Sequence, residues 1–534
     1  MVNRRKFIKR SLQAGLTGYL GVQALDGLAL GGLALENLPV GSNPIIPTGD
    51  QPDVIFFMTD QQRWDALGML NPHIHTPNLD RLARNGIIYR EATCQSPSCV
   101  PSRNSMMFGL YPSQLRVFGN GSLALDDSKL PCDTLPARFQ KAGYQTAGFG
   151  KTHWGRSFEP RSTRGFEVRV VGAKEVGMEK GARYQDDENP SGLAAYRKET
   201  DAFGPGEEGV PGFVGCTSQV EERDHRDGYV AEKCLEFLDA GVDPNRPLFL
   251  YLSFLKPHAG LNVPKRFEDL YDINTIPDTE QPPWEEEPDT HLAYSDKGSD
   301  SLGARYQTWR EAWTAMTPME RRRTTLRYYA NCSWLDHYFG LAMDNLEKLG
   351  RSRKTLFVYT SDHGEMLGER NFRFTKYCLY DSSVRVPLIL AGSAVPLSLH
   401  GTIDDRPAEL VDLYPTLMAA SGNSMEIKSP GLDLLSDQKH IGSFSEYHDS
   451  GAPAYMWRTP KFKLILFMDK PLDEAHLAPD SAKGELYDLE ADPHEWKNLY
   501  ADSGYSLIRE KMKTDLLMHL ACTWSSWTNI KTVK

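Results

Sequence analysis

The chain lacks several features that define whole classes of proteins. It has only eight cysteines in 534 residues. None of them forms a Cys-x-x-Cys pair or a Cys/His spacing typical of structural zinc. So sparse a set also argues against a dense disulfide framework. The fold must therefore depend on a hydrophobic core, for which a content of 40% hydrophobic residues is sufficient.

The chain also lacks an excess of positive charge. Asp and Glu number 71 against 60 Lys and Arg, which gives a formal net charge of -11 at pH 7. This balance argues against nucleic acid as a partner, although a small anionic substrate needs only a locally positive pocket. The length allows one large domain with a smaller one, or two to four average domains.

The apolar stretch near the N-terminus, residues 12–35, lacks a clean run of 18 residues that could span a bilayer. Three polar residues interrupt it: Gln13, Gln23 and Asp26. The basic sequence Arg4-Arg5-Lys6-Phe7-Ile8-Lys9 precedes it and resembles a twin-arginine signal. We therefore expect an export signal over residues 1–42, the twin-arginine export machinery as a partner, and a periplasmic or extracellular bacterial protein. An ordinary secretory signal and a membrane anchor are the alternatives.

Between residues 43 and 440, short apolar runs alternate with helical patterns. Four runs predict strands buried on both faces: Asp53–Thr59, Gln145–Gly150, Pro247–Phe254 and Thr355–Thr360. Helical patterns separate them: Pro77–Gly86, Leu135–Ala142, Tyr229–Leu238 and Thr324–Leu349. This alternation predicts an α/β fold in which helices sandwich a large, mostly parallel sheet.

Two other parts of the chain depart from the alternation. Residues 156–224 and 257–323 are rich in Gly, Pro and charge, and segments of this length usually shape a binding site. After residue 440, Lys461–Phe467 and Gly484–Leu489 resemble antiparallel strands. We therefore expect a main α/β domain over residues 43–440 and a smaller C-terminal α+β subdomain over residues 441–534.

Polar side chains follow each of the four predicted strands. They are Asp60 and Gln61, Lys151 and His153, Lys256 and His258, and Asp362 and His363. Functional groups of an open parallel sheet collect beyond the carboxyl ends of its strands, so we expect these residues to meet at one edge. Any one of them alone could be a helix cap or a surface group.

The strand-end residues divide into two chemical groups. The side chains of Asp60, Gln61, Asp362 and His363 offer the oxygen and imidazole ligands that suit a divalent cation. A second group offers positive charge and protons for an anion and its leaving group: Lys151, His153, His258 and Lys376. A metal facing cationic side chains is the arrangement expected for sulfuryl or phosphoryl transfer.

The segment Cys99-Val-Pro-Ser-Arg103, followed by Gly109, resembles the signature of the type I sulfatases, a family of the alkaline-phosphatase-like superfamily. Further segments resemble that family in the same order: Gly150–His153, Pro257-His258, Ser361–Glu365, Lys376 with Tyr380 and Val384–Pro387, and Leu486–Pro493 with Asn498-Leu499. The resemblance covers nearly all of the chain after its first 40 residues. It implies an alkaline-phosphatase-like fold and a hydrolase of sulfuric esters.

The resemblance also implies a role for each residue of the motifs. Cys99 would be oxidised to formylglycine by a formylglycine-generating maturase, and its hydrate would attack sulfur. The metal ligands would be Asp60, Gln61, Cys99, Asp362 and His363. Arg103 would stabilise the formylglycine, and Lys151 and Lys376 would contact sulfate oxygens. His153 would assist release of sulfate, and His258 would protonate the departing alcohol.

Some residues depart from the usual pattern of that family. Many members have Asp-Asp and Asp-Asn where this chain has Asp60-Gln61 and Asp362-His363. We expect one divalent cation, with calcium as the first choice, while the amide and imidazole improve the case for manganese or zinc. Phe108 also stands where the family usually has Thr, close to the signature that a maturase reads.

These patterns leave three functional hypotheses. The first is hydrolysis of a sulfate monoester, with a sulfated carbohydrate as the substrate. The second is hydrolysis of a phosphonate monoester or a phosphodiester, because the Asp-Gln and Asp-His pairs also occur in that branch of the superfamily. The third is a non-catalytic binder of sulfated glycans in which Cys99 remains a thiol.

Overall fold

The computed structural model describes residues 51–174, 178–202, 214–284, 311–350, 355–449, 452–468 and 483–525. The expected signal segment, residues 1–42, lies outside these ranges. Within them, no helix has the length and apolar character that crossing a bilayer requires.

A nine-stranded sheet forms the centre of the molecule, in the order β12-β2-β11-β10-β1-β8-β4-β5-β6. Its strands are β12 (Thr402–Asp404), β2 (Gly86–Tyr89), β11 (Leu388–Gly392), β10 (Thr355–Ser361), β1 (Asp53–Thr59), β8 (Leu248–Ser253), β4 (Gln145–Gly150), β5 (Val168–Val171) and β6 (Arg183–Tyr184). Only β11 runs antiparallel to its neighbours. The mostly parallel sheet is therefore confirmed, with one reversed strand that the sequence patterns did not reveal.

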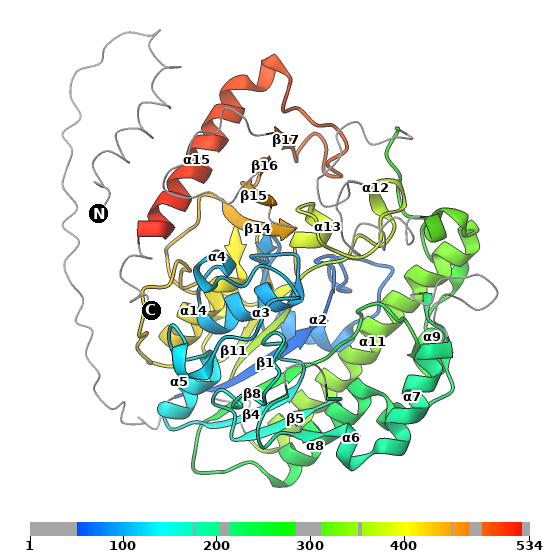
Figure 1. Ribbon diagram of the computed structural model, residues 1–534. Coiled ribbons are helices and arrows are strands. Elements are labelled where there is room, and N and C mark those ends of the chain that lie inside the picture. Colours follow the sequence, from blue (N-terminus) through cyan, green and yellow to red (C-terminus); the bar gives the residue numbers. More distant parts are fainter. Residues whose placement is uncertain are drawn as a thin grey trace.

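Helices cover both faces of this sheet (Figure 1). One face packs against α2 (Pro77–Arg84), α8 (Arg226–Ala240) and α11 (Pro318–Lys348). The other face packs against α3 (Cys99–Phe108), α5 (Leu135–Lys141) and α14 (Leu413–Ala420). The central strand β1 supplies both cores, because Phe56 points to one face and Phe57 to the other.

Helix α11 begins at Pro318, six residues before the predicted start. Thr317 caps it: its hydroxyl accepts from the Glu320 backbone N–H, while the Glu320 carboxylate accepts from the Thr317 backbone N–H. The charged run that follows, residues 320–323, resembled a loop in the sequence because it carries no apolar face. The capping box explains why this polar turn is nevertheless helical.

The segment 156–224 is less of a loop than its composition indicated. It contains the edge strands β5 and β6, which extend the central sheet beyond β4, and the helices α6 (Gln185–Glu188) and α7 (Pro190–Ala202). Two short pairings lie outside the central sheet: β3 (Ala92–Thr93) with β13 (Ala408–Glu409), and β7 (Thr217–Ser218) with β9 (Val263–Pro264). Within the described ranges, the short α-helices are α4 (Pro112–Leu115), α9 (Lys265–Glu268), α12 (Glu369–Phe372) and α13 (Asp381–Val384).

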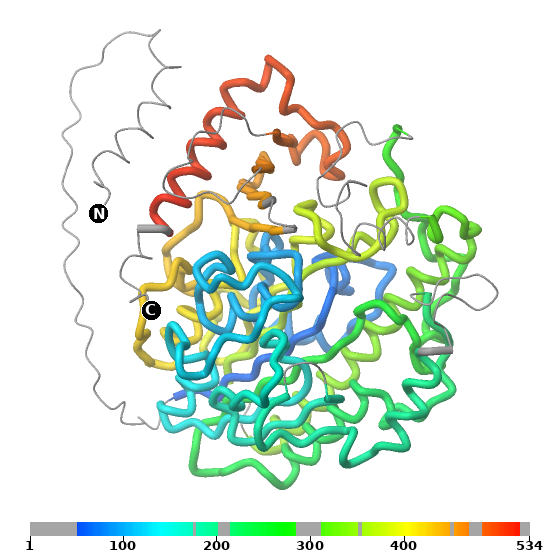
Figure 2. Tube along the Cα trace, in the orientation of Figure 1, coloured from blue at the N-terminus to red at the C-terminus, as the bar shows by residue number. Residues whose placement is uncertain are grey.

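The C-terminal part forms a second, antiparallel sheet at one end of the molecule, orange to red in Figure 2. Its strands are β14 (Ser443–Asp449), β15 (Ala452–Arg458), β16 (Phe462–Phe467) and β17 (Lys483–Asp488), and α15 (Ser506–Ser525) packs on β15 and β16. Buried ion pairs join it to the main domain, with Asp381 at 2.7 Å from Arg458 and 2.5 Å from Lys463. The expected smaller α+β unit is present, and the boundary at residue 440 stays a prediction.

Candidate active site

The four strands that carry the predicted site residues are adjacent in the sheet, in the order β10-β1-β8-β4. They are parallel, and their carboxyl ends are aligned because Thr59 pairs with Ser361 and Ser253 pairs with both Met58 and Gly150. The residues that follow these strands therefore leave the sheet at the same edge. For the backbone, this arrangement agrees with the expectation from the sequence. The Lys256 ammonium differs from it, because its hydrogen bonds go to the carbonyl of Gly260 and to Asn262, at 2.8 Å from Oδ1.

A compact cluster of metal-ligand types lies at this edge. Asp60, Cys99, Asp362 and His363 each offer one ligand atom, and these four atoms lie within 4.8 Å of one another. The Cys99 sulfur is 3.2 Å from Nε2 of His363 and 3.8 Å from Oδ1 of Asp60. All four residues are buried. Gln61 adjoins the cluster, because its backbone N–H donates to Oδ1 of Asp362 at 3.0 Å.

Cys99 occupies the first position of α3, and Arg103 lies one turn further along the same helix. The Arg103 guanidinium donates to Asp362 Oδ2 at 2.7 Å and to Asp60 Oδ2 at 3.0 Å. It also donates to the backbone carbonyl of Lys151 at 2.7 Å and to the Ser253 hydroxyl at 2.9 Å. Arg103 therefore holds the two carboxylates in place and ties them to the loop that carries Lys151.

Two lysines reach the cluster from different segments. Nζ of Lys376 lies 3.3 Å from the Cys99 sulfur and 2.6 Å from Oε1 of Gln61. Nζ of Lys151, directly after β4, lies 2.7 Å from Oδ2 of Asp60. The segment that carries Lys376 has several residues with a positive φ, among them Leu367, Thr375 and Tyr377. Such backbone is strained in residues other than glycine and is typical of functional sites.

The three predicted histidines differ in their surroundings. The ring of His363 places Nδ1 3.0 Å from the carbonyl of Gly364, so a proton on Nδ1 leaves Nε2 free to bind a cation. His258 places Nδ1 3.3 Å from the carbonyl of Ala259. His153 lines a smaller cavity of about 30 Å³ beside Lys151. Within the described residues, no hydrogen bond joins the His153 ring to the Cys99 cluster.

Charges within the site shift the pKa values of its acids and bases. Burial acts to raise the pKa of Asp60, but Lys151, Lys376 and Arg103 together hold it well below its usual value. Burial and Asp60 act to raise the pKa of Cys99, and the same two lysines outweigh them and lower it. Burial, reinforced by Lys376, lowers the pKa of His258 to about 3. Burial instead raises the pKa of Asp362. The resting site therefore favours ionised Asp60 and Cys99 beside a neutral His258.

The donor set fits a divalent cation. It contains two carboxylates, an amide oxygen, and an imidazole nitrogen whose ring can carry its proton on the other nitrogen. Calcium prefers the oxygen ligands of this set, while manganese and zinc also accept the imidazole nitrogen. Lys151 and Lys376 now pair with Asp60 and Gln61, so part of the negative charge is balanced within the protein.

Two further residues belong to the site geometry, although no role was assigned to them from the sequence. Asn120 donates to the Tyr377 hydroxyl at 3.0 Å, and its Nδ2 lies 4.0 Å from the Cys99 sulfur. Glu365 accepts a hydrogen bond from the side-chain amide of Gln61. Glu365 lies within the motif Ser361–Glu365 and could have been found there, whereas Asn120 lies in a loop without a pattern of its own.

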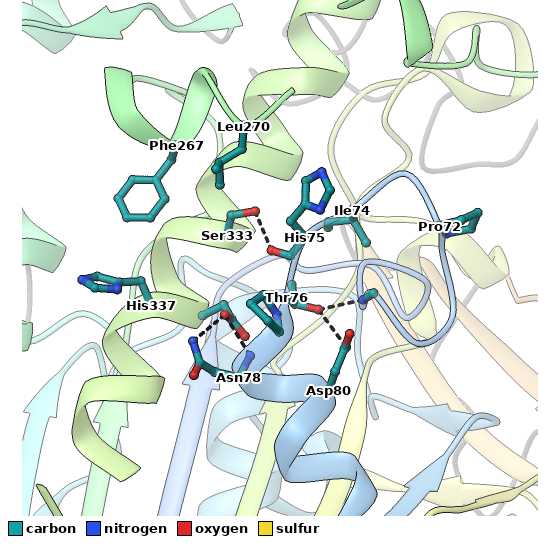
Figure 3. A pocket seen from close by; sticks show the side chains of 13 residues that line it. Pro72, Ile74, His75, Thr76, Asn78, Asp80, Phe267, Leu270, Ser333 and His337 are labelled. Carbon is teal, nitrogen blue, oxygen red and sulfur yellow. Dashed lines mark hydrogen bonds between the residues drawn. The ribbon is translucent and has the colours of Figure 1, made fainter. Parts of the chain in front are cut away.

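The larger of the two cavities described here lies elsewhere (Figure 3). It has a volume of about 510 Å³ and lies between the start of α2, α9 and the middle of α11. Asp336 caps α2 there, because it accepts from the backbone N–H groups of Asn78 and Leu79 at 3.2 and 2.7 Å. None of the predicted site residues lines this cavity.

Comparison with known proteins adds independent evidence. The family model for sulfatases matches residues 52–423, and the model described as N-sulphoglucosamine sulphohydrolase, C-terminal, matches residues 368–521. A protein of Formosa agariphila named sulfatase is 27% identical over 505 residues, which cover 90% of this chain and 89% of that protein.

Two solved structures share the fold. The phosphonate monoester hydrolase of Silicibacter pomeroyi has a TM-score of 0.70 at 20% identity, covering 89% of this chain and 96% of its own. The protein BT4656, solved with its substrate D-glucosamine-2-N,6-O-disulfate, has a TM-score of 0.65 at 21% identity, covering 90% of this chain and all of its own. At these identities the likeness concerns the fold alone, and it agrees with the alkaline-phosphatase-like architecture expected from the sequence.

Proposed function

The chain belongs to the sulfatase family, and we propose that it hydrolyses sulfate monoesters with a formylglycine nucleophile generated from Cys99. The observation that carries this proposal is the surroundings of the Cys99 sulfur. It lies 3.2 Å from the His363 imidazole and 3.3 Å from the Lys376 ammonium, with Asp60 at 3.8 Å. A nucleophile at this position adjoins both a cation-binding cluster and a group that can bind a sulfate oxygen.

The modified residue would supply the nucleophile. Formylglycine offers a hydrate with two hydroxyls, one that attacks sulfur and one that expels sulfate as the aldehyde re-forms. Lys151 and Lys376 bind the sulfate oxygens and stabilise the negative charge that develops on them. His258 is neutral in the resting site. The negative charge of bound sulfate favours its protonated form, and His258 then gives this proton to the departing alcohol, so that the alcohol leaves neutral. Arg103 stabilises the nucleophile through the carboxylates that it orients, and His153 assists the release of sulfate.

One divalent cation belongs to this proposal. Asp60, Gln61, Asp362 and His363 would hold it together with the modified Cys99. When bound, it would lower the pKa of the hydrate and screen the negative charge of sulfate. Calcium is the first choice by resemblance to the family, and the softer His363 nitrogen supports manganese or zinc as the alternatives.

We further propose that the substrate is a sulfated carbohydrate. A related fold binds a disulfated glucosamine. Two exposed cations are also close in sequence to the residues of the small cavity that Lys151 lines. Arg156 follows the cavity residue Trp154 by two positions, and Lys180 directly follows the cavity residue Glu179. Such charges suit the further anionic groups of a sulfated glycan.

Export supports the same class of substrate, because sulfated polymers lie outside the cell. The proposed partners are accordingly the twin-arginine export machinery, which reads residues 1–42, and a formylglycine-generating maturase. Intact-peptide mass spectrometry tests whether Cys99 has been modified as such a maturase would modify it. Conversion of the Cys99 thiol to an aldehyde leaves a defined loss of mass, whereas an unmodified thiol in active protein would contradict the nucleophile.

A second candidate function is hydrolysis of phosphonate monoesters or phosphodiesters. The pairs Asp60-Gln61 and Asp362-His363 favour it, because they also occur in that branch of the superfamily. Rates with 4-nitrophenyl sulfate, bis(4-nitrophenyl) phosphate and 4-nitrophenyl phenylphosphonate separate the two candidates, since all three release the same phenolate. A higher kcat/KM for either phosphorus ester would replace the sulfatase reaction as the main activity.

A further inference from the structure

The side-chain amide of Gln61 is held from both ends. Its Oε1 lies 2.6 Å from Nζ of Lys376, and its Nε2 donates to the carboxylate of Glu365. An ammonium group only donates hydrogen bonds and an ionised carboxylate only accepts them. Only one of the two orientations of the amide therefore satisfies both neighbours, and it is the one with the oxygen toward Lys376 and the Cys99 cluster.

The backbone of Gln61 is fixed as firmly as its side chain. Its N–H donates to Oδ1 of Asp362 at 3.0 Å, and its carbonyl accepts from the Tyr328 hydroxyl at 2.7 Å. Its φ of 67° lies in the left-handed region, which a residue with a side chain adopts only when its surroundings require it. The remaining freedom of Gln61 is the rotation of its amide.

Glu365 is well placed to remove that freedom. It is buried, and its other oxygen accepts from the backbone N–H groups of Leu367, at 2.9 Å, and Thr375. Both residues belong to the strained segment that leads to Lys376. The carboxylate thus connects the amide of Gln61 to the backbone of the segment that supplies the sulfate-binding lysine.

We propose that Glu365 is a positioning residue that keeps the amide oxygen of Gln61 turned toward the divalent cation. The inference rests on the cation of the proposed function. If Lys376 turns to a sulfate oxygen when substrate binds, Nε2 of Gln61 keeps two neighbours, Glu365 and, at 3.5 Å, the Thr375 hydroxyl. A hydroxyl can donate as well as accept, so the carboxylate of Glu365 is the neighbour that still fixes the direction of the amide. Rotation by 180° would present the NH₂ group to the cation, which removes one ligand and places a donor against a positive charge. Neighbours that orient metal ligands in this way typically matter for affinity by about 10- to 100-fold.

The substitution Glu365→Gln tests this role, because it keeps the shape of the side chain and allows it to donate. We expect Mn²⁺, titrated by calorimetry into the full-length demetallated protein, to bind at least about tenfold more weakly. The exchange variant Gln61→Glu with Glu365→Gln restores the hydrogen bond with its direction reversed. It also presents two equivalent oxygens to the cation, so we expect its affinity to return to within about threefold of the unsubstituted protein.

A matched control is Asp336→Asn, which changes another buried carboxylate that accepts from a side-chain amide, that of Asn78 at 2.9 Å, and from the backbone N–H of Leu79. Its Mn²⁺ affinity should equal that of the unsubstituted protein. Equal affinity in Glu365→Gln, or no recovery in the exchange variant, would overturn the positioning role. If the unsubstituted protein bound none of Ca²⁺, Mn²⁺ and Zn²⁺, the proposed cation would fail, and the positioning role with it.

Thermal melting shows whether each variant folds. If Glu365→Gln does not, Glu365→Asp replaces it, because a shorter carboxylate keeps the charge but withdraws from the Gln61 amide. We expect the same loss of Mn²⁺ affinity, and an unchanged affinity would contradict the proposal.

Discussion

The two sides of the Cys99 site differ in how firmly the protein holds them. On the carboxylate side, Asp60 and Asp362 are fully buried and share the Arg103 guanidinium at 3.0 and 2.7 Å. The two histidines assigned to sulfate release and to protonation of the leaving group, His153 and His258, which we call the imidazole side, are only partly buried. The hydrogen bonds described for their rings are few, with His258 contacting the carbonyl of Ala259 at 3.3 Å.

The two groups of residues have different proposed roles, and each role explains how firmly the group is held. A cation and a nucleophile gain most from ligands that are fixed before the reaction, because no reorganisation is then needed in the transition state. A proton donor must instead reach a leaving group that enters and departs. Lys151 and Lys376 connect the two sides, because each pairs with a residue of the carboxylate side while its charge is available to an anion.

Removing the nucleophile between the two sides should have the largest effect. Cys99→Ala is expected to reduce kcat/KM by about 10⁴-fold or more, because the variant lacks the group that attacks sulfur. Unfolding in urea should show little change, since the side chain lies within the site cluster rather than among large apolar groups. A purified variant that keeps a tenth of the rate would remove Cys99 from this role.

Substituting one of the two buried carboxylates should prevent the cation from binding. Asp362→Ala deletes an expected ligand and leaves Arg103 with one carboxylate fewer, so we expect loss of bound metal by elemental analysis and a fall in kcat/KM of about 10³-fold. It should also destabilise the fold by about 3 kcal/mol, because Arg103 remains buried with part of its charge unpaired.

A comparison with Asp133→Ala controls for general effects, since Asp133 pairs with the surface residue Lys141 at 2.6 Å. That variant should keep its metal and nearly all of its stability. If Asp362→Ala retained the metal content of the unsubstituted protein, the ligand assignment for Asp362 would be wrong.

The sequence predicted the α/β fold and the meeting of the strand ends because both follow from short-range patterns. Apolar runs identify the strands, and parallel strands bring the residues after them to one edge. Strand β11 was not among the predicted strands, and its reversal was not predicted either, because Leu388–Gly392 is as apolar as a parallel strand would be. Direction within a sheet depends on the path of the connecting chain, which local patterns do not encode.

For the site, residues in motifs were identified and residues in loops were not. Asp60, Cys99 and Asp362 lie in recognisable segments, and the structure brings their ligand atoms together. Asn120 contacts the Cys99 sulfur from a loop, 21 residues further along the chain. Helical and strand periodicity relate only residues a few positions apart, so no pattern in the sequence connects Asn120 to Cys99. The roles assigned to all these residues stay predictions until variants are measured.

The imidazole side can be tested through the leaving group. If His258 protonates the departing alcohol, His258→Ala should lower kcat/KM for an alkyl sulfate by about 10²- to 10⁴-fold. The same variant should affect 4-nitrophenyl sulfate far less, because 4-nitrophenolate leaves without a proton. Lys151→Ala is the matched control, and it should slow both esters alike, since it acts on the sulfate oxygens. Equal losses in His258→Ala would exclude the role of proton donor.

The prediction with the smallest expected effect also concerns His258. It describes how the free energy of unfolding depends on pH. Burial, with Lys376 second, lowers the pKa of His258 from 6.5 to about 3 in the folded protein. Between these values the unfolded chain binds a proton that the folded protein does not, so stability rises with pH and is lost as the pH falls below 6.5. His258→Gln removes this contribution, and the acid slope of the free energy of unfolding should become shallower by about 1 kcal/mol per pH unit.

Urea unfolding of both proteins at several pH values between 4 and 7 (about one unit apart) measures this slope. His73→Gln, which changes an exposed histidine, should leave the slope of the unsubstituted protein unaltered. An equal slope in His258→Gln would mean that His258 takes up a proton as readily in the folded protein as in the unfolded chain. His258 would then be as accessible to water as a surface residue. The difference in solvent exposure between His258 and the buried carboxylates of Asp60 and Asp362 would be larger than in the structure.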